Sequence, residues 1–380
     1  MSTTMTHTQY RPDYVSPPGE TLLEALEERE MTQAELAQRT GRPKKTINEI
    51  VKGKAAITPE TALQFERVLG IPATFWNKRE QQYREALARL QDEQRLKGWK
   101  DWLKALPVKQ MIAHGWVKRC EDKAAQVLEL LTFFGVASPD AYEVVYEQEI
   151  VAFRKAGVST ATVDHGATAA WLRQGEIAAT EIDCAPYNER RFREALRRIR
   201  TLTTEPPEVF EPEVVRLCAE AGVAVVFVPE LPRTGICGAI RWLTPTKALI
   251  QLSLRYKTDD HLWFSFFHEA GHILLHGKRE AFFETGEMAG TDEEDQANEL
   301  ARDILIPLPE WQRFVGSGQY HSKADIAYFA EQVGIAPGIV VGRLQHDQYL
   351  PFSHCNDLKQ RLEWVEASDG EDDEGEGQAE

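Results

Sequence analysis

The feature that most constrains this chain is the run His268 to His272 (HEAGH), which lies inside a long apolar stretch. Read as a helix, the run places its two histidines one turn apart on the same face. Two imidazoles in that arrangement can bind one Zn²⁺, with Glu269 beside the metal as a general base. We expect the helix to end at Gly277, a residue suited to the left-handed conformation. The alternative is an ordinary core helix that carries two histidines.

A second helix is predicted between residues 292 and 306, with Pro307 ending it. Its apolar stripe consists of Ala297, Leu300, Ala301, Ile304 and Leu305. Glu294 and Asn298 are four residues apart and share a face, so Glu294 could be a third ligand and Asn298 could hydrogen-bond the ligands. Two histidines and a glutamate with one open position form a hydrolytic zinc site rather than a structural one. These ligand types do not discriminate Zn²⁺ from Mn²⁺ or Fe²⁺.

Together these two segments resemble a known family. His268 to His276, then Glu294 to Asn298, then Leu305 to Pro307 are similar to the ImmA/IrrE family of zinc metallopeptidases. The resemblance implies a zincin-like α+β domain with a repressor protein as substrate. It implies three metal ligands and a catalytic base: His268, His272 and Glu294, with Glu269.

Other groups near the motif have less defined roles. His276 extends the histidine spacing to i+8 and lies about 12 Å along the helix from His268, too far to share one ion. We expect it at the helix C-terminus, where a partly cationic ring is favourable. The residue that stabilises the oxyanion is not assigned by the sequence, although Tyr256, Arg302 and His321 are candidates.

Three strands are predicted upstream of the motif, at residues 223–228, 238–243 and 247–252. The last two are joined by a Thr-Pro-Thr turn. A small sheet next to the metal helix would give a peptidase an edge strand, with which an extended substrate can pair.

The N-terminal part predicts a helix-turn-helix. A first amphipathic helix begins at Thr21, and a second begins after Thr32, which forms a capping box with Glu35. The second helix breaks at Gly41, and a third begins near Pro43 and ends near residue 53. In this arrangement the later helix enters the DNA major groove.

Charge agrees with DNA binding, because six basic residues between Arg39 and Lys54 face a single acid, Glu49, in a chain of net charge −16. Base contacts are expected from Lys44, Lys45, Thr46 and Asn48, early on the third helix. Phosphate contacts are expected from Gln33, Lys52 and Lys54. The alternative is a helical bundle with a solvated basic edge.

This region also resembles a family. The segments that carry the likeness to HigA-type antitoxins of the XRE-like helix-turn-helix class are Met31 to Ala37, Lys45 to Lys54, Ile57 to Leu63, Gly70 to Pro72 and Phe75-Trp76. The resemblance implies binding to a double-stranded DNA operator, as a homodimer on a pseudo-palindrome.

The resulting fold class is multidomain and mainly α, with an α+β part. We divide the chain into a flexible arm (1–18), a helix-turn-helix domain (19–95), a helical middle region (96–205), a metallopeptidase domain with a small sheet and the HExxH helix (206–366) and an acidic disordered tail (367–380). Five scattered cysteines and the absence of a long apolar run predict a cytoplasmic protein with reduced thiols and no membrane contact.

The middle region offers weaker patterns. Four tryptophans among basic residues could stack on single-stranded nucleic acid, but their helical spacing favours core positions; they are Trp99, Trp102, Trp116 and Trp171. Six arginines between Arg190 and Arg200 favour a solvated helix face over a phosphate contact. Residues 322–344 predict two helices around Gly334 that lack groove-reading side chains.

Two functions are therefore open. The first is a DNA-binding zinc endopeptidase that cleaves a regulatory protein, either a repressor or a toxin-related partner. The second is an antitoxin-like transcriptional repressor whose metallopeptidase-like domain senses a ligand or partner without turnover. The intact Glu269 favours the first, because a binding-only domain has no need of a base.

Overall fold

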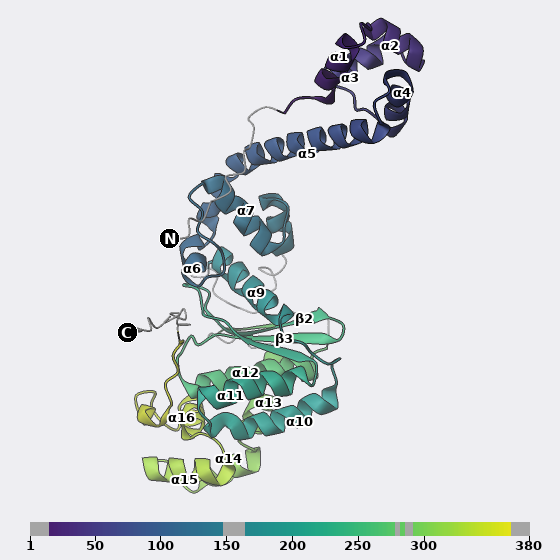
Figure 1. Ribbon diagram of the computed structural model, residues 1–380. Helices are drawn as coiled ribbons and strands as arrows, with labels where there is room; N and C mark the ends of the chain where they lie inside the picture. Colours follow the sequence, from purple (N-terminus) through teal and green to yellow (C-terminus); the bar gives the residue numbers. More distant parts are fainter. Residues whose placement is uncertain (1–14, 147–163, 278–281, 286–291, 366–380) are drawn as a thin grey trace, which may run out of the picture. The chain divides into compact units, whose positions relative to one another are not determined.

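A computed structural model describes residues 15–146, 164–277, 282–285 and 292–365 (Figure 1). The chain divides into two compact units, Met1–Lys100 and Asp101–Glu380. The predicted acidic tail (367–380) lies outside the described residues, as does the predicted arm up to residue 14.

The first unit is helical. Its helices are α1 (Pro18–Glu27), α2 (Gln33–Thr40), α3 (Lys44–Val51), α4 (Pro59–Leu69) and α5 (Ala73–Gly98). The Thr32 hydroxyl accepts a hydrogen bond from the backbone N–H of Glu35, as the predicted cap requires. Gly41 adopts φ 68°, the left-handed conformation that ends α2 before the turn into α3. Pro43 precedes α3 as its N-cap and is not inside the helix.

A shared apolar core holds α2 and α3 together. Leu36 from α2 and Ile47 and Ile50 from α3 pack with Phe65 of α4 and Trp76 of α5, and all five are buried. Burial of large apolar side chains stabilises such a bundle by about 1.5–3 kcal/mol each. α5 begins at Ala73, and its first turn supplies Trp76 to this core.

The second unit surrounds a small sheet with helices. Its early helices are η1 (Lys100–Ala105, which begins at the end of the first unit), α6 (Val108–Ala113), α7 (Lys123–Phe134), α9 (His165–Thr180), α10 (Glu189–Thr201), η2 (Leu202–Thr204) and α11 (Pro207–Ala219). Its later helices are α12 (Asp259–Leu275), α13 (Asp292–Leu305), α14 (Leu308–Gly316), α15 (Lys323–Val333), α16 (Pro337–His346) and η3 (Asn356–Leu358).

The sheet is mixed, with the order β1-β3-β2-β4. Its strands are β1 (Val223–Phe227), β2 (Ile236–Thr244), β3 (Lys247–Leu252) and β4 (Phe282–Thr285). β1 pairs parallel with β3, and β2 pairs antiparallel with both β3 and β4. The three predicted strands are present, and the structure adds β4 as an edge strand directly after α12.

Helices cover both faces of this sheet (Figure 1). Val223 and Val225 of β1 face one apolar cluster with α10, α11 and α12, whereas Ala224 and Val226 face a second cluster with α7 and α9. A sheet covered on both faces needs apolar residues at every position, which explains the continuous apolar run of β1. The predicted fold class, mainly α with an α+β part, is confirmed.

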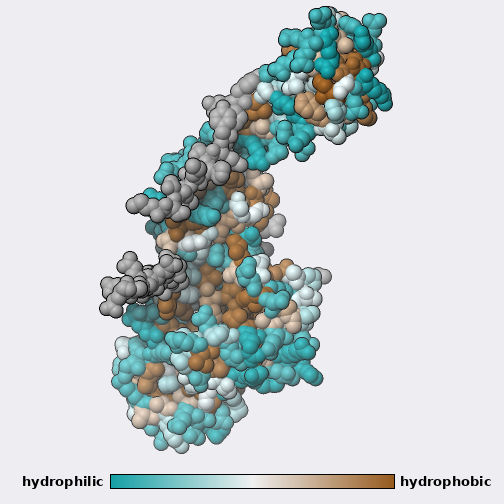
Figure 2. Space-filling view, viewed as in Figure 1, coloured by the Kyte–Doolittle hydropathy of each residue, from teal (hydrophilic) through white to brown (hydrophobic). Residues whose placement is uncertain are grey.

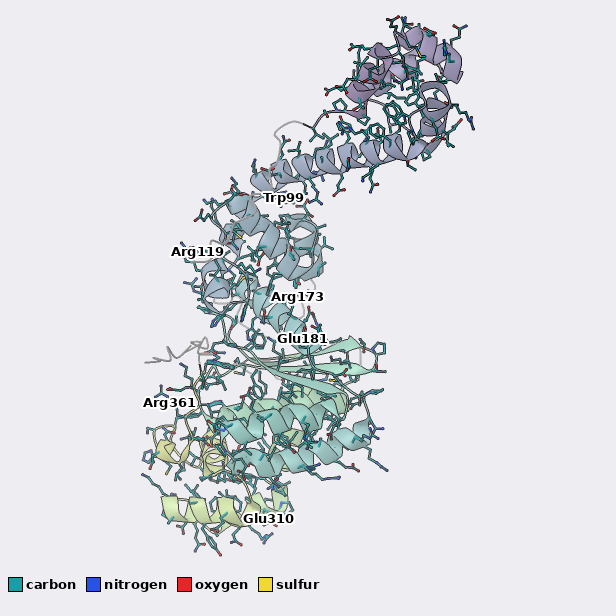
Figure 3. All side chains as sticks on the ribbon, viewed as in Figure 1. Trp99, Arg119, Arg173, Glu181, Glu310 and Arg361 are labelled. Carbon is teal, nitrogen blue, oxygen red and sulfur yellow. The ribbon has the colours of Figure 1, made fainter. Side chains whose placement is uncertain are left out.

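The middle helices belong to the same compact unit as the sheet. Trp171 of α9 is fully buried, and its indole N–H donates to the carbonyl of Val228. Gln251 of β3 donates to the carbonyl of Trp171. Arg173 on α9 (Figure 3) donates to the carbonyl of Phe133 at the end of α7. Trp171 is thus a core residue, and Trp102 and Trp116 pack against the same cluster.

One arginine of α10 makes contacts to other helices, and the others are more exposed. Arg200 donates to the carbonyls of Ile304, Leu305 and Val333, so it joins α10 to α13 and α15. The others are more exposed, and the surface over α10 is hydrophilic in Figure 2. Within the described ranges no single helix has the length and apolar character of a membrane span, although the bent pair α15 and α16 passes that test by length and composition.

A last segment returns to the start of α12. Residue Thr258 forms an antiparallel bridge with Arg361, and the N–H of Asp259 donates to the carbonyl of Gln360. In return the Asp259 carboxylate accepts from the N–H of Gln360 at 3.0 Å. This returning segment (residues 356–362) therefore holds the first turn of the helix that carries the HEAGH run.

Candidate metal centre

α12 is the central helix of the second unit. It packs against the sheet, α13 and α16, and its buried face includes Leu262, Phe266 and Ile273. The helix ends at Leu275 with His276 as C-cap, and Gly277 follows with φ 78°. The end of the helix is therefore where the sequence predicts it.

Three side chains from α12 and α13 meet at one point. The Nε2 atoms of His268 and His272 lie 3.0 Å apart. Glu294 of α13 places Oε2 3.2 Å from Nε2 of His268 and Oε1 3.5 Å from Nε2 of His272. The two histidines are each 1% exposed, so the cluster is buried.

The other ring nitrogens have partners that fix the orientation of each imidazole. Nδ1 of His268 lies 3.0 Å from Oδ1 of Asn298, and Nδ1 of His272 lies 3.0 Å from Nδ1 of His276. These contacts leave both Nε2 atoms directed at Glu294. Such outer partners set the tautomer and basicity of a ligand. His276 therefore does more than end the helix: it positions His272.

The electrostatics keep these groups in the form that binds a cation. Burial lowers the pKa of His272, only partly offset by its hydrogen bond with Glu294, so the ring is neutral near pH 7. Burial would raise the pKa of Glu294, but hydrogen bonds and charge interactions with the two histidines lower it to about 2. A metal binds neutral imidazole and ionised carboxylate, so His272 and Glu294 are already in the form that binds it.

The geometry also fits a divalent ion. One nitrogen from each histidine and one oxygen from Glu294 all lie within 4.8 Å of one another. With metal bonds of about 2.1 Å, tetrahedral ligands are roughly 3.4 Å apart. The observed separations of 3.0, 3.2 and 3.5 Å are close to that value. This set of two nitrogens and one oxygen can hold a metal ion.

Glu269 lies on the sheet side of α12. It is fully buried, and its carboxylate abuts Gly238 of β2. A Cβ at position 238 would lie 2.6 Å from Oε1 of Glu269, so only glycine leaves room for this carboxylate. Sequence reasoning missed Gly238, although a glycine inside a strand is a signal of close approach.

A second glycine sets the distance between the two helices. A Cβ at Gly271 would lie 3.2 Å from Cα and 3.3 Å from the carbonyl oxygen of Ala297. The contact brings α13 close enough for Glu294, one turn before Asn298, to reach both imidazoles. Gly271 is thus part of the site through packing.

The candidates for oxyanion stabilisation have contacts elsewhere. The Tyr256 ring stacks on His261 with centroids 4.1 Å apart, and His321 is exposed beside Tyr320. Arg302 lines a cavity between α12, α13 and α16.

The predicted DNA-contacting residues lie on α2, α3 and the loop after it. Four lysines are exposed: Lys44, Lys45, Lys52 and Lys54. Gln33, Thr46 and Asn48 are partly exposed. Two other basic residues of this region have partners within the unit: exposed Arg39 pairs with Glu35, and partly buried Arg42 contacts Gln64 and Glu60.

Comparison with known proteins finds one family match in each unit. Residues 22–76 match the helix-turn-helix family, and residues 233–345 match the IrrE N-terminal-like domain of the M78 peptidases. The chain carries a helix-turn-helix domain and an IrrE N-terminal-like domain. The second match spans the sheet from just before β2, the HEAGH run, Glu294 and most of α16.

One solved structure is similar to a short part of the chain. It is an addiction module antidote protein of the HigA family from Coxiella burnetii, 26% identical, and the match covers 22% of this chain and 92% of that one with a TM-score of 0.21. No curated protein matches the chain.

Proposed function

We propose that this protein is a DNA-binding transcriptional regulator whose IrrE N-terminal-like domain is a metal-dependent endopeptidase. One observation carries the proposal: His268, His272 and Glu294 converge with Nε2 and carboxylate atoms 3.0–3.5 Å apart, and Glu269 follows the first ligand directly. A purely structural metal site would have four protein ligands and no adjacent base. The substrate class is a regulatory protein, a repressor or a toxin-related partner.

Each residue of the site has a separate role in the proposed hydrolysis. A divalent cation, with Zn²⁺ favoured by this ligand set, would lower the pKa of water and polarise the scissile carbonyl. Glu269 accepts the proton of the attacking water and delivers it to the leaving amine. Asn298 and His276 hold the rings of His268 and His272 in place. Gly238 provides the space for the Glu269 carboxylate.

The sheet offers a way to orient an extended substrate. β4 is the edge strand next to β2, and it follows α12 directly in the chain. An extended peptide could pair with the outer edge of β4 by backbone hydrogen bonds and so extend the sheet on the side of the metal helix.

The test compares new protein N-termini in cells that express equal amounts of wild type, Glu269→Gln or His272→Ala. We expect fragments only with wild type. We expect Glu269→Gln to keep its metal content, as measured on the purified protein, because the three ligands are intact. His272→Ala should lose the metal. If wild type and Glu269→Gln both hold metal and give the same N-termini, the peptidase assignment is wrong.

The burial of the site favours a second candidate function. His268 and His272 are 1% exposed and Glu269 is 0% exposed, which leaves little access for a peptide in this conformation. An antitoxin-like repressor could use such a closed site to sense a ligand or partner without turnover. The same comparison discriminates the two, because sensing requires the metal ligands and not the base.

For the first unit we propose binding to an operator as a homodimer. The support is the exposed lysines on α3 and in the loop after it, on a helix pair that packs into one buried core. Two copies on a pseudo-palindrome would place two recognition helices in successive major grooves, about 34–36 Å apart. Footprinting of the operator with wild type and with Lys44→Ala, Lys45→Ala would show whether α3 makes the contact.

A further inference from the structure

A cavity of about 260 Å³ lies between α12, α13, α16 and the chain after α16. The three candidate metal ligands are not among the residues that line it. Its walls are mainly apolar and include Phe264, Leu305, Ile339 and Phe352. At roughly 30 Å³ per water molecule it has the volume of about nine waters, so an occupant would have about ten non-hydrogen atoms. That is below the size of drug-like ligands, whose pockets have roughly 300–1,000 Å³.

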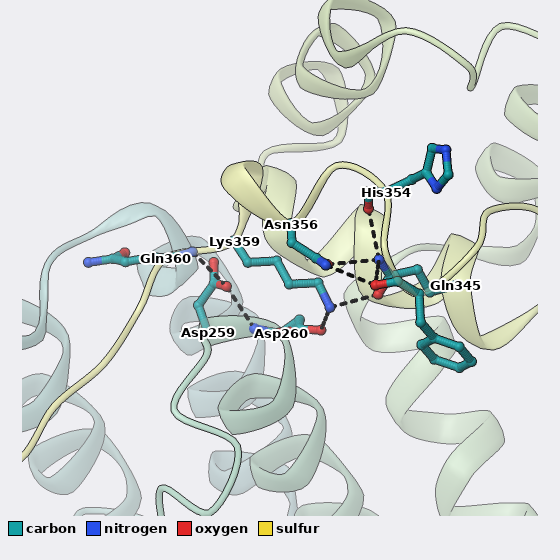
Figure 4. A network of polar contacts seen from close by, with 8 residues as sticks. Asp259, Asp260, Gln345, His354, Asn356, Lys359 and Gln360 are labelled. Carbon is teal, nitrogen blue, oxygen red and sulfur yellow. Dashed lines mark hydrogen bonds and ion pairs between the residues drawn. The ribbon is translucent and has the colours of Figure 1, made fainter.

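The charged side chains that line this cavity are mainly basic. They are Arg302, Arg343 and Lys359, and Asp260 is the one carboxylate among the described residues of the wall. Lys359 lies 2.7 Å from Oδ2 of Asp260 and donates to Oε1 of Gln345 at 2.8 Å (Figure 4). The other oxygen of Asp260, Oδ1, is buried and so does not face the cavity. This pair therefore adds no net charge to the wall, and two arginines remain.

Arg343 has partners within the protein. Its Nη1 donates to the carbonyls of Arg302 and Ile306. Its guanidinium lies over the Trp311 ring and 3.6 Å from the carboxylate of Asp347. Burial lowers the pKa of Arg343, Asp347 offsets part of that effect, and the charge of Arg302 lowers the pKa further. Arg343 thus joins α13 to α16 and places a second positive charge near Arg302.

Arg302 is the cation of the wall that lacks a partner. Its guanidinium makes no hydrogen bond or ion pair with any described residue, although the side chain is only partly exposed. The acids that act on the two arginines, Asp347 and the exposed Asp303, do not line the cavity. A carboxylate matches the planar fork of donors on a guanidinium, and its charge would offset the repulsion between two neighbouring arginines. The wall therefore favours an anion.

An apolar cavity with one such cation fits an amphiphilic anion. We propose that it binds an apolar monocarboxylate of about ten non-hydrogen atoms, an arylacetic acid or a medium-chain fatty acid. The carboxylate pairs with Arg302, and the apolar body packs against Phe264 and Ile339. An ammonium group has no place in this cavity, because the one acid of its wall is already paired. This assignment does not depend on peptidase activity.

The position of the cavity indicates what binding would affect. Phe264, which lines it, lies one turn before His268, and the two rings stack with centroids 6.1 Å apart. Arg302 lies one turn after Asn298, whose Oδ1 contacts His268. An occupant would therefore contact one neighbour of a metal ligand on each helix, and the cavity is placed to act as an effector site.

The first test is calorimetric titration of the full chain with phenylacetate and with octanoate. Phenylacetamide and 2-phenylethylamine have the same aromatic body, without a charge and with the opposite charge. We expect one site per chain for at least one carboxylate and none for the amide or the amine. Binding of phenylacetate alone would identify an aryl acid as the ligand, and binding of octanoate alone would identify an alkyl acid.

Variants then locate the carboxylate. Arg302→Met keeps an apolar stem and should weaken binding by roughly ten- to a hundredfold. Arg313→Met removes an arginine from α14, outside the cavity, and should bind as wild type does. Because a carboxylate can also bind a metal ion, wild type stripped of metal by dialysis against EDTA is titrated as well. We expect its affinity for the carboxylate to be unchanged.

A further measurement locates the site even if Arg302→Met folds poorly. The carboxylate that binds should, at saturation, slow amide hydrogen exchange in residues 337–346 and 351–360 of wild type and leave α10 unchanged. The proposal is wrong if neither carboxylate binds, if the amide or the amine binds equally well, or if Arg302→Met binds as tightly as Arg313→Met. Loss of binding with the metal, or slower exchange elsewhere and not in these segments, would also overturn it.

Discussion

Gly238 and Glu269 are in direct contact across the interface between β2 and α12: a Cβ at position 238 would lie 2.6 Å from Oε1 of the carboxylate. The strand thereby determines where the candidate general base can lie. Because a β-strand backbone is difficult to displace, the carboxylate is held more firmly than an exposed glutamate would be.

Gly238→Ala should therefore separate metal binding from hydrolysis. The added methyl displaces Glu269 or bends β2, at a cost of about 1–3 kcal/mol in the free energy of unfolding. We expect the metal content to stay near that of wild type and the cleavage rate to fall at least tenfold. The control is Ala239→Gly, which changes the adjacent residue on the opposite face; equal activity of the two variants would contradict the assigned contact.

Gly271→Val should act on the metal instead. Its side chain would collide with the backbone of Ala297 and push α13, with Glu294, away from the histidines. We expect the metal affinity, measured by competition with a chromogenic chelator, to fall by at least tenfold. Gly316→Val on α14 is the matched control, because a Cβ there has no neighbour within 4 Å. Unchanged metal affinity in Gly271→Val would show that the close approach of α12 and α13 is not needed for metal binding.

Replacement of His276 should weaken the metal site without abolishing it. Its Nδ1 lies 3.0 Å from Nδ1 of His272 and fixes the tautomer of that ligand. Loss of such an outer partner typically costs about 10–100-fold in metal affinity or activity. We expect His276→Ala to fall in that range and His272→Ala to lose the ion. Replacement of the exposed His354 by alanine should leave the metal affinity unchanged. If His276→Ala binds metal as tightly as wild type, His276 has no role in the metal centre.

The stability of the second unit should fall as the pH rises from about 4 to 7 and level off above that. Burial, with the nearby charge of Asp260, raises the pKa of Asp259 from 3.8 to about 7. Between about pH 4 and 7 the folded state binds the proton that the unfolded state has released, so the free energy of unfolding decreases with pH. Relative to wild type, Asp259→Asn should gain at most about 4 kcal/mol at pH 8 and little at pH 4.

Urea denaturation at several pH values, in the presence of EDTA so that metal release does not contribute, measures this difference. Glu331→Gln on the exposed face of α15 is the control and should show no pH-dependent gain. A constant difference between Asp259→Asn and wild type from pH 4 to pH 8 would contradict the raised pKa.

DNA binding should depend on the exposed lysines of α3 and the loop after it. Lys44→Ala with Lys45→Ala should reduce affinity for the operator by at least tenfold, since base contacts contribute about 1–3 kcal/mol each. Lys52→Ala with Lys54→Ala should instead flatten the dependence of log K on log salt by roughly 2. Lys78→Ala with Arg95→Ala removes two charges from α5. This pair should change neither the affinity for the operator nor the salt dependence. Equal effects of all three pairs would indicate nonspecific attraction only.

The parts of this structure that the sequence predicts are those set by local patterns. The HEAGH run lies on a helix because its apolar neighbours recur at helical spacing, and Gly277 ends that helix where a left-handed residue is needed. The Thr32 cap and the Gly41 turn are equally local. His276 was expected at the helix end, and its place there agrees with that expectation. Its contact with His272 follows from the same i,i+4 spacing but was not foreseen.

The parts that sequence patterns do not predict depend on residues far apart in the chain. Gly238 and Glu269 are separated by 31 positions, and Asp260 and Lys359 by 99 positions. No periodicity connects such pairs, because their contact is set by tertiary packing. β4 has strand-favouring Phe and Thr residues but is only four residues long, too short for a pattern to show, so pairing with β2 is what makes it a strand.

The bonds between residues 356–362 and the start of α12 have a consequence for how the protein is made. During synthesis the HEAGH helix leaves the ribosome well before Lys359, Gln360 and Arg361, which hold its first turn. A nascent chain can therefore bring the two histidines and Glu294 together before that turn is anchored. The first turn of α12 is anchored only after residues 356–362 have been synthesised. A chain whose translation stops before them would lack the bonds that hold this turn.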